Sequence, residues 1–205
     1  EGPLADFKLT DKDRYELRIA ALLHDCGKVT TPVHVVDKAT KLQTLFDRIH
    51  LIDTRWEVVR RDAEIAKWRN IAEGQPAEAA ERDYHIFCRQ LESDREHLRH
   101  ANIGCEKMDE AAIARVRQIA EAYRWQGPGG QVQPFLSADE IENLTIRSGT
   151  LNAAEREIIN HHIVATIRML EQLPWPRHLK NVPEYAGGHH ERVDGKGYPR
   201  GLKRE

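Results

Sequence analysis

The chain has 205 residues, of which 40% are hydrophobic and 31% charged, a balance typical of a soluble globular protein with one hydrophobic core. Its 31 basic and 33 acidic residues give a formal net charge of −2, which argues against broad electrostatic binding of nucleic acid or a membrane surface. Cys26, Cys88 and Cys105 are too few and too scattered for a disulfide framework or a zinc site, which favours a reducing cytoplasm. No stretch approaches the roughly 20 apolar residues of a membrane span, so we expect no membrane contact by this fragment.

Histidines are frequent and clustered. The chain has 11 of them, among them the pairs His161-His162 and His189-His190, and His24 stands directly before Asp25. Imidazole nitrogens and carboxylate oxygens are common metal ligands, so this clustering indicates metal binding. The chain begins without a methionine and ends directly after a turn-rich motif. We interpret it as a fragment, truncated at its C-terminal end, and a membrane-anchored parent protein stays compatible with it.

The first predicted helix runs from about Thr10 to Leu23. Thr10 or the residue after it can cap the N-terminus, and apolar residues then recur on one side. The buried end of this helix delivers His24 and Asp25, and Gly27 then ends it.

A long helical arm is predicted next. From Leu42, apolar residues recur in alternating steps of three and four for about four heptads, which predicts a coiled-coil seam. Segment 73–76 breaks this helix, and a second, weaker seam follows from Phe87 to Ile119, with Asp94 intruding. We expect two antiparallel helices of roughly 33 and 45 residues, which at about 1.5 Å per residue project on the order of 50 Å. Such an arm is a spacer and not a core, unless its seams pair with a second protomer in a homodimer.

The rest of the chain is predicted to rejoin the first helix. Residues 127–130 cannot continue a helix, so we expect a flexible hinge or loop there. Capping boxes at 137–140 and 152–155 start two helices, and the second runs to about Leu173 with His161 and His162 midway. A short helix from Pro183 leads into His189. These elements predict an all-α bundle, residues 1–39 and 127–205, interrupted by a long antiparallel coiled-coil hairpin at residues 40–126.

The clustered histidines have the chemistry of a site with several metal ions. Adjacent helical residues point about 100° apart, so His189 and His190 would each serve a different ion. A carboxylate beside a histidine, as in His24-Asp25, offers one nitrogen ligand and an oxygen that can bridge two cations. Together with His162 they form a set without thiolates, which favours iron or manganese over structural zinc. Any one histidine alone would as readily cap a helix or fill a polar gap, but the ensemble favours two or three divalent ions.

Two further features accompany this set. Lys28 follows the His-Asp pair and could neutralise a phosphate in the transition state, although a lysine near a helix end also favours the helix dipole. The segment from Asp194 to Pro199 alternates glycines with charged residues, so we expect an ordered turn, with a generic loop as the alternative.

Two motifs resemble the HD-GYP family of the HD hydrolase superfamily. The segment Leu22-Leu23-His24-Asp25-Cys26-Gly27-Lys28 is similar to the superfamily signature. The segment 189–202, which reads HHERVDGKGYPRGL, is similar to the extended motif of the HD-GYP branch. The resemblance covers about residues 10–38 and 138–205 and implies an HD-type helical bundle.

The resemblance also implies roles for individual residues. Asp25 and Lys28 take catalytic roles, and the metal ligands are His24, Asp25, His162, His189 and His190. His162 is favoured over His161 as the ligand. The GYP loop would contact substrate or a partner through Arg192, Asp194, Gly195, Gly197, Tyr198 and Pro199.

The chain also departs from the family pattern. Ile163 stands where the family usually has proline. The family's further ligands, on a helix before the His-Asp pair and on one after the GYP loop, would lie outside this fragment. The connection between the His-Asp pair and the next histidine is much longer than usual, as in related proteins with an inserted helical hairpin.

The activity implied by the resemblance is the hydrolysis of cyclic di-GMP to pGpG and/or GMP, in bacterial second-messenger signalling, by a metal-bridged hydroxide that attacks phosphorus in line. One alternative is a catalytically silent HD-GYP module that binds nucleotide or a partner protein, such as a signalling protein at the GYP loop. The retained His24, Asp25 and His189 argue against it. A third hypothesis is that the same metal chemistry acts on another nucleotide phosphate as the substrate. The intact Gly197-Tyr198-Pro199 favours cyclic di-GMP.

Overall fold

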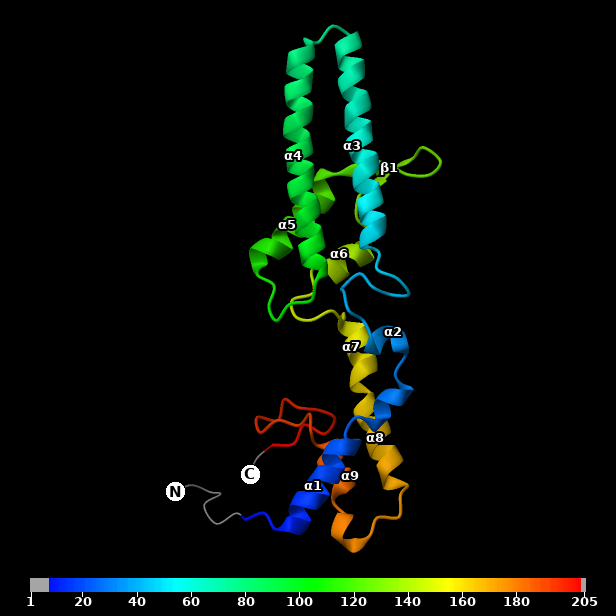
Figure 1. Ribbon diagram of the computed structural model, residues 1–205, viewed down its shortest axis with the longest axis vertical. Coiled ribbons are helices and arrows are strands. Elements are labelled where there is room, and N and C mark those ends of the chain that lie inside the picture. The colour runs from blue at the N-terminus through cyan, green and yellow to red at the C-terminus, as the bar shows by residue number, and fades with distance from the viewer. Residues whose placement is uncertain (1–7, 204–205) are drawn as a thin grey trace. The chain divides into compact units, whose positions relative to one another are not determined.

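The computed structural model describes residues 8–203, so the outermost residues of the predicted bundle, 1–7 and 204–205, lie outside the description. The described chain is mostly helical, with one small two-stranded sheet, which confirms the all-α fold class. Contacts divide it into two compact units: the first unit is Glu1–Val36 with Ala154–Glu205, and the second unit is Asp37–Ala153. Figure 1 shows the elements of each. None of the helices in the described part of the chain is long and apolar enough to cross a membrane.

The first unit begins with α1 (Asp11–Leu23), as predicted. The Thr10 hydroxyl accepts from the Asp13 amide, and the Asp13 carboxylate accepts from the Thr10 amide at 2.8 Å, which completes a capping box. His24 and Asp25 follow, and then come the 3-10 helix η1 (Cys26–Thr30) and the short α2 (Val33–Val36). The helix therefore ends before Gly27, which lies inside η1, so the prediction that Gly27 ends it was wrong.

The second half of the first unit holds α7 (Ala153–Asn160), α8 (His162–Glu171), η2 (Arg177–Leu179) and α9 (Val182–Gly187). A continuous helix to about Leu173 was predicted, but the helix is interrupted at His161. The interruption coincides with a close approach by the η1 turn, since a Cβ on Gly27 would lie 2.1 Å from the His162 carbonyl oxygen.

A small apolar core joins α1, α8 and α9. Its buried members are Ala20, Leu170, Val182 and Ala186, with Cys26 and Trp175 packed against them. A polar contact adds to it, because the buried Glu16 carboxylate accepts from the Asn181 amide at 2.6 Å and from its side chain at 3.2 Å. Cys26 thus contributes to packing and not to the histidine set.

The second unit contains a helical hairpin of α3 (Ile49–Ala72) and α4 (Ala77–Asn102), whose antiparallel course is clear in Figure 1. Both helices are shorter than predicted, and at about 1.5 Å per residue they reach only on the order of 40 Å. Residues 42–48 are not part of α3, because the end of α4 binds them in a turn. The Asn102 side chain accepts from the Leu42 amide at 2.8 Å and donates to the Asp47 carboxylate at 2.9 Å. A coiled-coil register of the two seams stays a prediction.

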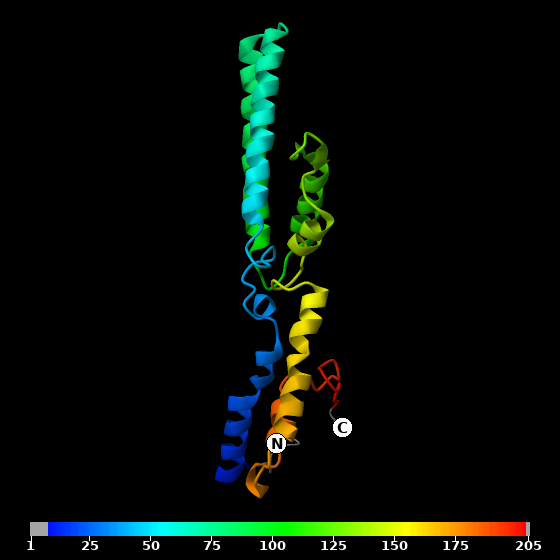
Figure 2. The same cartoon turned by 90° about the vertical axis from the view of Figure 1, so that its right-hand side faces the viewer.

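The predicted second long helix is broken after Asn102. The chain turns through Gly104, and the Asp109 carboxylate caps a separate helix, α5 (Glu110–Ala122), by accepting from the Ala112 amide at 2.6 Å. Figure 2 shows α5 and the segment that follows it, up to residue 144, beside the helical hairpin.

The glycine-rich segment after α5, where a flexible hinge or loop was expected, is the turn of a β-hairpin. Strands β1 (Arg124–Gln126) and β2 (Val132–Pro134) pair antiparallel. Gly129 and Gly130 have φ of +92° and +80°, which L side chains rarely adopt. Ser137 then caps α6 (Ala138–Leu144) through the predicted capping box with Glu140.

The second unit has a core of its own, contrary to the expectation of a coreless arm. Trp56 is 1% exposed, and its ring lies 4.8 Å from that of Tyr123 and 4.1 Å from that of Phe135. Asp94, the residue that intrudes on the seam, is buried and accepts from the Tyr123 hydroxyl at 2.8 Å and from Arg115 at 2.7 Å. Burial and the neighbouring Asp94 raise the pKa of Tyr123. Because β1, β2 and α6 pack with the hairpin, this unit extends to Ala153, beyond the predicted boundary at residue 126.

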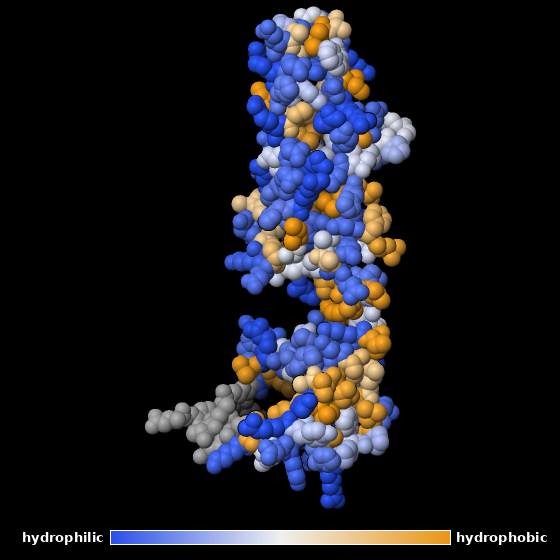
Figure 3. Space-filling model, viewed as in Figure 1, coloured by the Kyte–Doolittle hydropathy of each residue, from blue (hydrophilic) through white to orange (hydrophobic). Residues whose placement is uncertain are grey.

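The visible face of the second unit is mostly hydrophilic, with hydrophobic residues in separate patches (Figure 3). Many apolar side chains of this unit are buried in the internal core described above. The homodimer through the arm therefore stays a prediction.

Candidate metal centre

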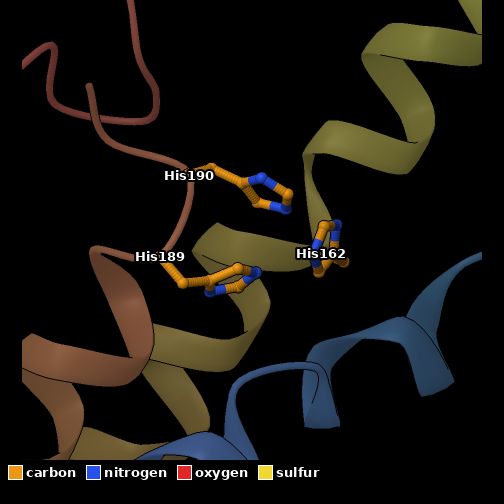
Figure 4. Close-up of side chains that lie close together, drawn as sticks. All are labelled: His162, His189 and His190. Carbon is orange, nitrogen blue, oxygen red and sulfur yellow. The ribbon is translucent and has the colours of Figure 1, made fainter.

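The histidines that the sequence singled out meet in the first unit. His162 opens α8, and His189 and His190 follow Gly188, the C-cap of α9. Figure 4 shows their three rings turned toward one another. His24 and Asp25 lie between α1 and η1. The ring centroids of His24 and His189 are 4.7 Å apart, and those of His162 and His190 are 5.5 Å apart. Residues more than 160 positions apart in the sequence thus share one site.

Asp25 lies at the middle of the set. Its Oδ1 is 3.2 Å from His162 Nε2 and 3.8 Å from His189 Nε2. Its Oδ2 is 3.1 Å from His24 Nε2 and 2.7 Å from Lys28 Nζ. The two oxygens of one carboxylate therefore face different histidines, which is the arrangement that a bridging ligand requires.

The backbone fixes the tautomers of three of the histidines. His24 Nδ1 lies 2.7 Å from the Ala21 carbonyl oxygen, and His189 Nδ1 lies 2.7 Å from that of Ala186. His162 Nδ1 contacts the Ile159 carbonyl in the same way. A carbonyl only accepts, so each Nδ1 carries a hydrogen, and in the neutral imidazole each Nε2 then presents a lone pair toward Asp25.

Two buried atoms of the set, one from Asp25 and one from His162, have no hydrogen-bond partner among the described residues. Asp25 Oδ1 and His162 Nε2 are buried and make no hydrogen bond within the described residues, although they lie only 3.2 Å apart. Two acceptors that face each other without a donor repel, and a buried polar atom without a partner is costly. A cation bound to both atoms would satisfy both, so the residues fit a metal ion.

The ligand atoms form two overlapping groups. One is His162, His189 and His190, and the other is His24, Asp25 and His189, with the ligand atoms of each group within 4.8 Å of one another. Burial and the neighbouring His189 and His162 lower the pKa of His190, which favours the neutral, ligating imidazole. Because His189 is common to both groups, the arrangement suits a cluster of ions better than a single ion.

Charges beside the centre keep the carboxylate ionised. Burial raises the pKa of Asp25, but the hydrogen bond and the positive charge of Lys28, with smaller electrostatic contributions from the neighbouring His24 and His162, outweigh it, and the net pKa is lowered. Lys28 itself is 42% exposed at its side chain. It places a mobile cation at the solvent side of the site, where an anionic substrate would arrive.

The sequence did not reveal the residue that holds the His-Asp turn in place. The buried Thr166 hydroxyl accepts from the Gly27 amide at 2.9 Å and donates to the His24 carbonyl at 3.3 Å. A Cβ on Gly27 would also lie 2.5 Å from the Thr166 backbone nitrogen, so glycine is required for this contact. The available signal was spacing, since Thr166 lies four residues after His162 and hence on the same helix face.

The GYP loop adjoins the centre through Tyr198. Its ring stacks on that of His190, with centroids 4.6 Å apart and planes 15° apart, and its amide donates to the His190 carbonyl at 3.3 Å. Gly197 has no room for a side chain, because a Cβ would lie 2.4 Å from the Arg192 amide nitrogen. Pro199 follows in a cis peptide. The loop is therefore ordered, as predicted, and one of its aromatic rings borders the histidines.

The remaining loop residues serve the loop itself. Arg192 pairs with Asp194 at 3.2 Å, and Gly195 has a φ of +74°. The Glu191 carboxylate, which the sequence analysis did not single out, accepts from the backbone amides of Arg200 at 2.7 Å and Leu202 at 2.8 Å. These bonds close the loop, and contacts of Arg192 and Asp194 with a ligand stay a prediction.

Comparison with family models gives two matches, each described as an HD domain. One covers residues 137–205 and the other covers residues 4–83. Together they contain all five residues of the histidine and aspartate set. They support the HD hydrolase superfamily. Comparisons with curated proteins and with solved structures found no match.

The two HD domain matches agree with the site's chemistry. HD domains indicate a metal-dependent phosphohydrolase, bind divalent metals and suggest a nucleotide-type substrate. In this chain the candidate ligands are nitrogen and carboxylate oxygen atoms, as such metals prefer.

Proposed function

We propose that this HD domain is a phosphodiesterase of the HD-GYP type, which hydrolyses cyclic di-GMP to pGpG and/or GMP with two or three divalent ions, iron or manganese. The observation that carries the proposal is the position of the Asp25 carboxylate, whose two oxygens face different histidines. Asp25 Oδ1 and His162 Nε2 also lack a hydrogen-bond partner among the described residues. The stacking of Tyr198 on His190 adds the GYP loop to the same site.

The chain's own residues supply binding, charge and shape. Bound divalent ions would supply a hydroxide nucleophile at neutral pH and offset charge on the phosphoryl oxygens. His24, His162 and His189 would hold them through Nε2, since Nδ1 is bonded to the backbone in each. Asp25 would bridge them, and Lys28 can leave its contact with Asp25 to pair with a phosphoryl oxygen.

Substrate would be bound where charge and aromatic surface meet. Lys28 offers a cation, and the Tyr198 ring offers a flat surface beside His190 on which a purine base can stack. Neither group needs to act as a nucleophile, so the chain requires no reactive serine or cysteine at this site. Action on another nucleotide phosphate would use the same metal chemistry without requiring the GYP loop.

The decisive experiment combines metal analysis with turnover. The purified protein, loaded with iron or manganese, is assayed for cyclic di-GMP hydrolysis beside a His189→Ala, His190→Ala double variant, with His178→Ala as an exposed control from the same unit. We expect two or more metal equivalents and pGpG production that only the double variant loses. The opposite result is a protein that retains no metal and binds cyclic di-GMP but does not hydrolyse it after iron or manganese is added. That result would overturn the enzyme proposal and favour the silent binding module.

A signalling-protein partner at the GYP loop, homodimerisation through the arm and a cytoplasmic location stay predictions. For the first of these, Val193 in the loop is 77% exposed, which provides apolar surface for a partner.

A further inference from the structure

A pocket of about 350 Å³ lies between α1 and α9, which pack against each other in the first unit. One wall comes from a single face of α1, because its residues follow one another at helical steps of three, one and three positions. These residues are Leu17, Ala20, Ala21 and His24. The other wall is formed by Tyr185 of α9 and by His189, which follows that helix. Two of the six side chains are those of alanine, which leaves space between the helices.

The lining of this pocket is open to solvent and adjoins the metal centre. Tyr185 is 43% exposed and Leu17 is 38% exposed, and the side chains of His24 and His189 are partly exposed. The rings of these two histidines are in edge-to-face contact, with centroids 4.7 Å apart. A ligand in the pocket can therefore contact the apolar wall and lie directly beside two of the candidate metal ligands.

The chemistry of the lining favours an uncharged, planar group. Apart from the two histidines, the lining consists of aliphatic side chains and the ring of Tyr185. Such a surface offers no opposite charge to a phosphate, whereas a flat, apolar group would cover the exposed carbon atoms. Every nucleobase has a flat face that stacks on aromatic side chains. A nucleobase therefore fits this lining, and its phosphate does not.

We propose that the pocket between α1 and α9 holds the base of a nucleotide whose phosphate lies at the metal centre, with Tyr185 in contact with the base. A single ribose joins base and phosphate, so a pocket beside His24 and His189 is within reach of a base whose phosphate is bound there. Together with Tyr198, which stacks on His190, the centre would then have two aromatic surfaces, as the two bases of a cyclic dinucleotide require. The inference rests on the proposed function, because the metal centre supplies the phosphate site.

The test measures the affinity of the manganese-loaded chain for GMP and for ribose 5-phosphate by titration calorimetry. The two ligands share the sugar phosphate, so the ratio of their affinities isolates the contribution of the base. Neither ligand is a phosphodiester, so the proposed reaction consumes neither of them. Loss of one stacked aromatic side chain typically weakens binding about tenfold. We therefore expect GMP to bind about tenfold or more tightly than ribose 5-phosphate.

Two variants locate the base. Tyr185→Ala removes the ring, and Ala21→Leu fills the pocket from an exposed position on α1. Each should abolish the preference for GMP, with the affinity for ribose 5-phosphate and the metal content unchanged. Tyr185→Phe keeps the ring and should keep the preference. Tyr15→Ala is the matched control, because it removes another exposed tyrosine of the first unit that does not line the pocket.

Three results would overturn the proposal: equal affinities for GMP and ribose 5-phosphate, a preference that survives in Tyr185→Ala, or a preference that only Tyr198→Ala removes. The last result would place the base at the GYP loop. If Tyr185→Ala fails to fold, Ala21→Leu decides, because a preference that survives a filled pocket places the base elsewhere.

The cyclic di-GMP assay reports separately on the proposed function. Absence of turnover together with a preference for GMP that depends on Tyr185 would refute the phosphodiesterase and keep the base pocket. Turnover without any preference for GMP would refute the base pocket and keep the phosphodiesterase.

Discussion

Thr166 offers the sharpest test of how the metal centre is held. Replacing Thr166 by valine keeps the shape and the methyl group but removes the hydroxyl that joins α8 to the His-Asp turn. The Gly27 amide loses its acceptor at 2.9 Å and the His24 carbonyl loses a donor at 3.3 Å. A buried donor without a partner costs about 1 to 3 kcal/mol, and the longer bond adds little. The free energy of unfolding of the first unit should fall by about 2 kcal/mol.

The same change should also loosen the centre, because His24 and Asp25 are carried by the turn that Thr166 fixes. Loss of a group that orients metal ligands typically costs about 10- to 100-fold in metal affinity. Thr166→Ser is the matched control, since it keeps both hydrogen bonds and loses only a methyl group, worth about 1 kcal/mol.

The assay follows the first unit alone. Trp175 packs on the core of that unit, and its indole nitrogen donates to the Leu170 carbonyl at 2.8 Å, so its indole N–H signal reports unfolding in urea. Metal titration on the same samples gives the affinity. The reasoning is refuted if valine lowers stability and metal affinity no more than serine does.

Three further predictions concern other parts of the chain. His162→Ala should weaken metal binding on the order of 100-fold or more, whereas His161→Ala, the exposed neighbour, should leave the metal content unchanged by elemental analysis; equal losses would show that the wrong histidine was chosen. Gly197→Ala should lower cyclic di-GMP turnover on the order of 100-fold, because the new Cβ would lie 2.6 Å from the His190 carbonyl oxygen and displace the loop; wild-type kcat/KM would contradict the close packing. Burial raises the pKa of Glu140, but bonds from Arg55 and from the Ser137 amide outweigh it and hold the pKa below its usual value of 4.5. A carboxyl whose folded pKa is lowered stabilises the fold above the unfolded pKa, and this stabilisation is lost as the pH falls through the folded value. Urea unfolding of the second unit should therefore show a loss of stability below about pH 4.5 that is smaller in Glu140→Gln; identical pH profiles would rule out this ion pair as the cause.

Features that depend only on neighbouring residues could be predicted from the sequence. Thr10 and Ser137 begin helices because a side-chain oxygen reaches an amide three residues on, so those starts were predictable. The ordered loop around Gly195 and Gly197 was likewise predictable, because its signal lies in neighbouring residues. The choice of the five candidate metal ligands came from chemistry and resemblance to the HD-GYP family. The preference for His162 over His161 agrees with their burial, since His162 is 2% exposed and His161 is on the surface.

The positions of the helix breaks and the contacts between distant residues, by contrast, depend on three-dimensional packing and could not be predicted. The break after Asn102 follows from its side chain binding Leu42, sixty positions away, and no local signal marks such a contact. Apolar periodicity could not tell an extended arm from a unit with its own core, because Trp56 meets Phe135 only once β1, β2 and α6 fold back. The two-sided role of Asp25 likewise depends on α8 and α9 bringing distant histidines to its opposite oxygens. Long-range contacts of this kind are selected by packing in three dimensions, whereas caps and turns are selected within a few residues of the chain.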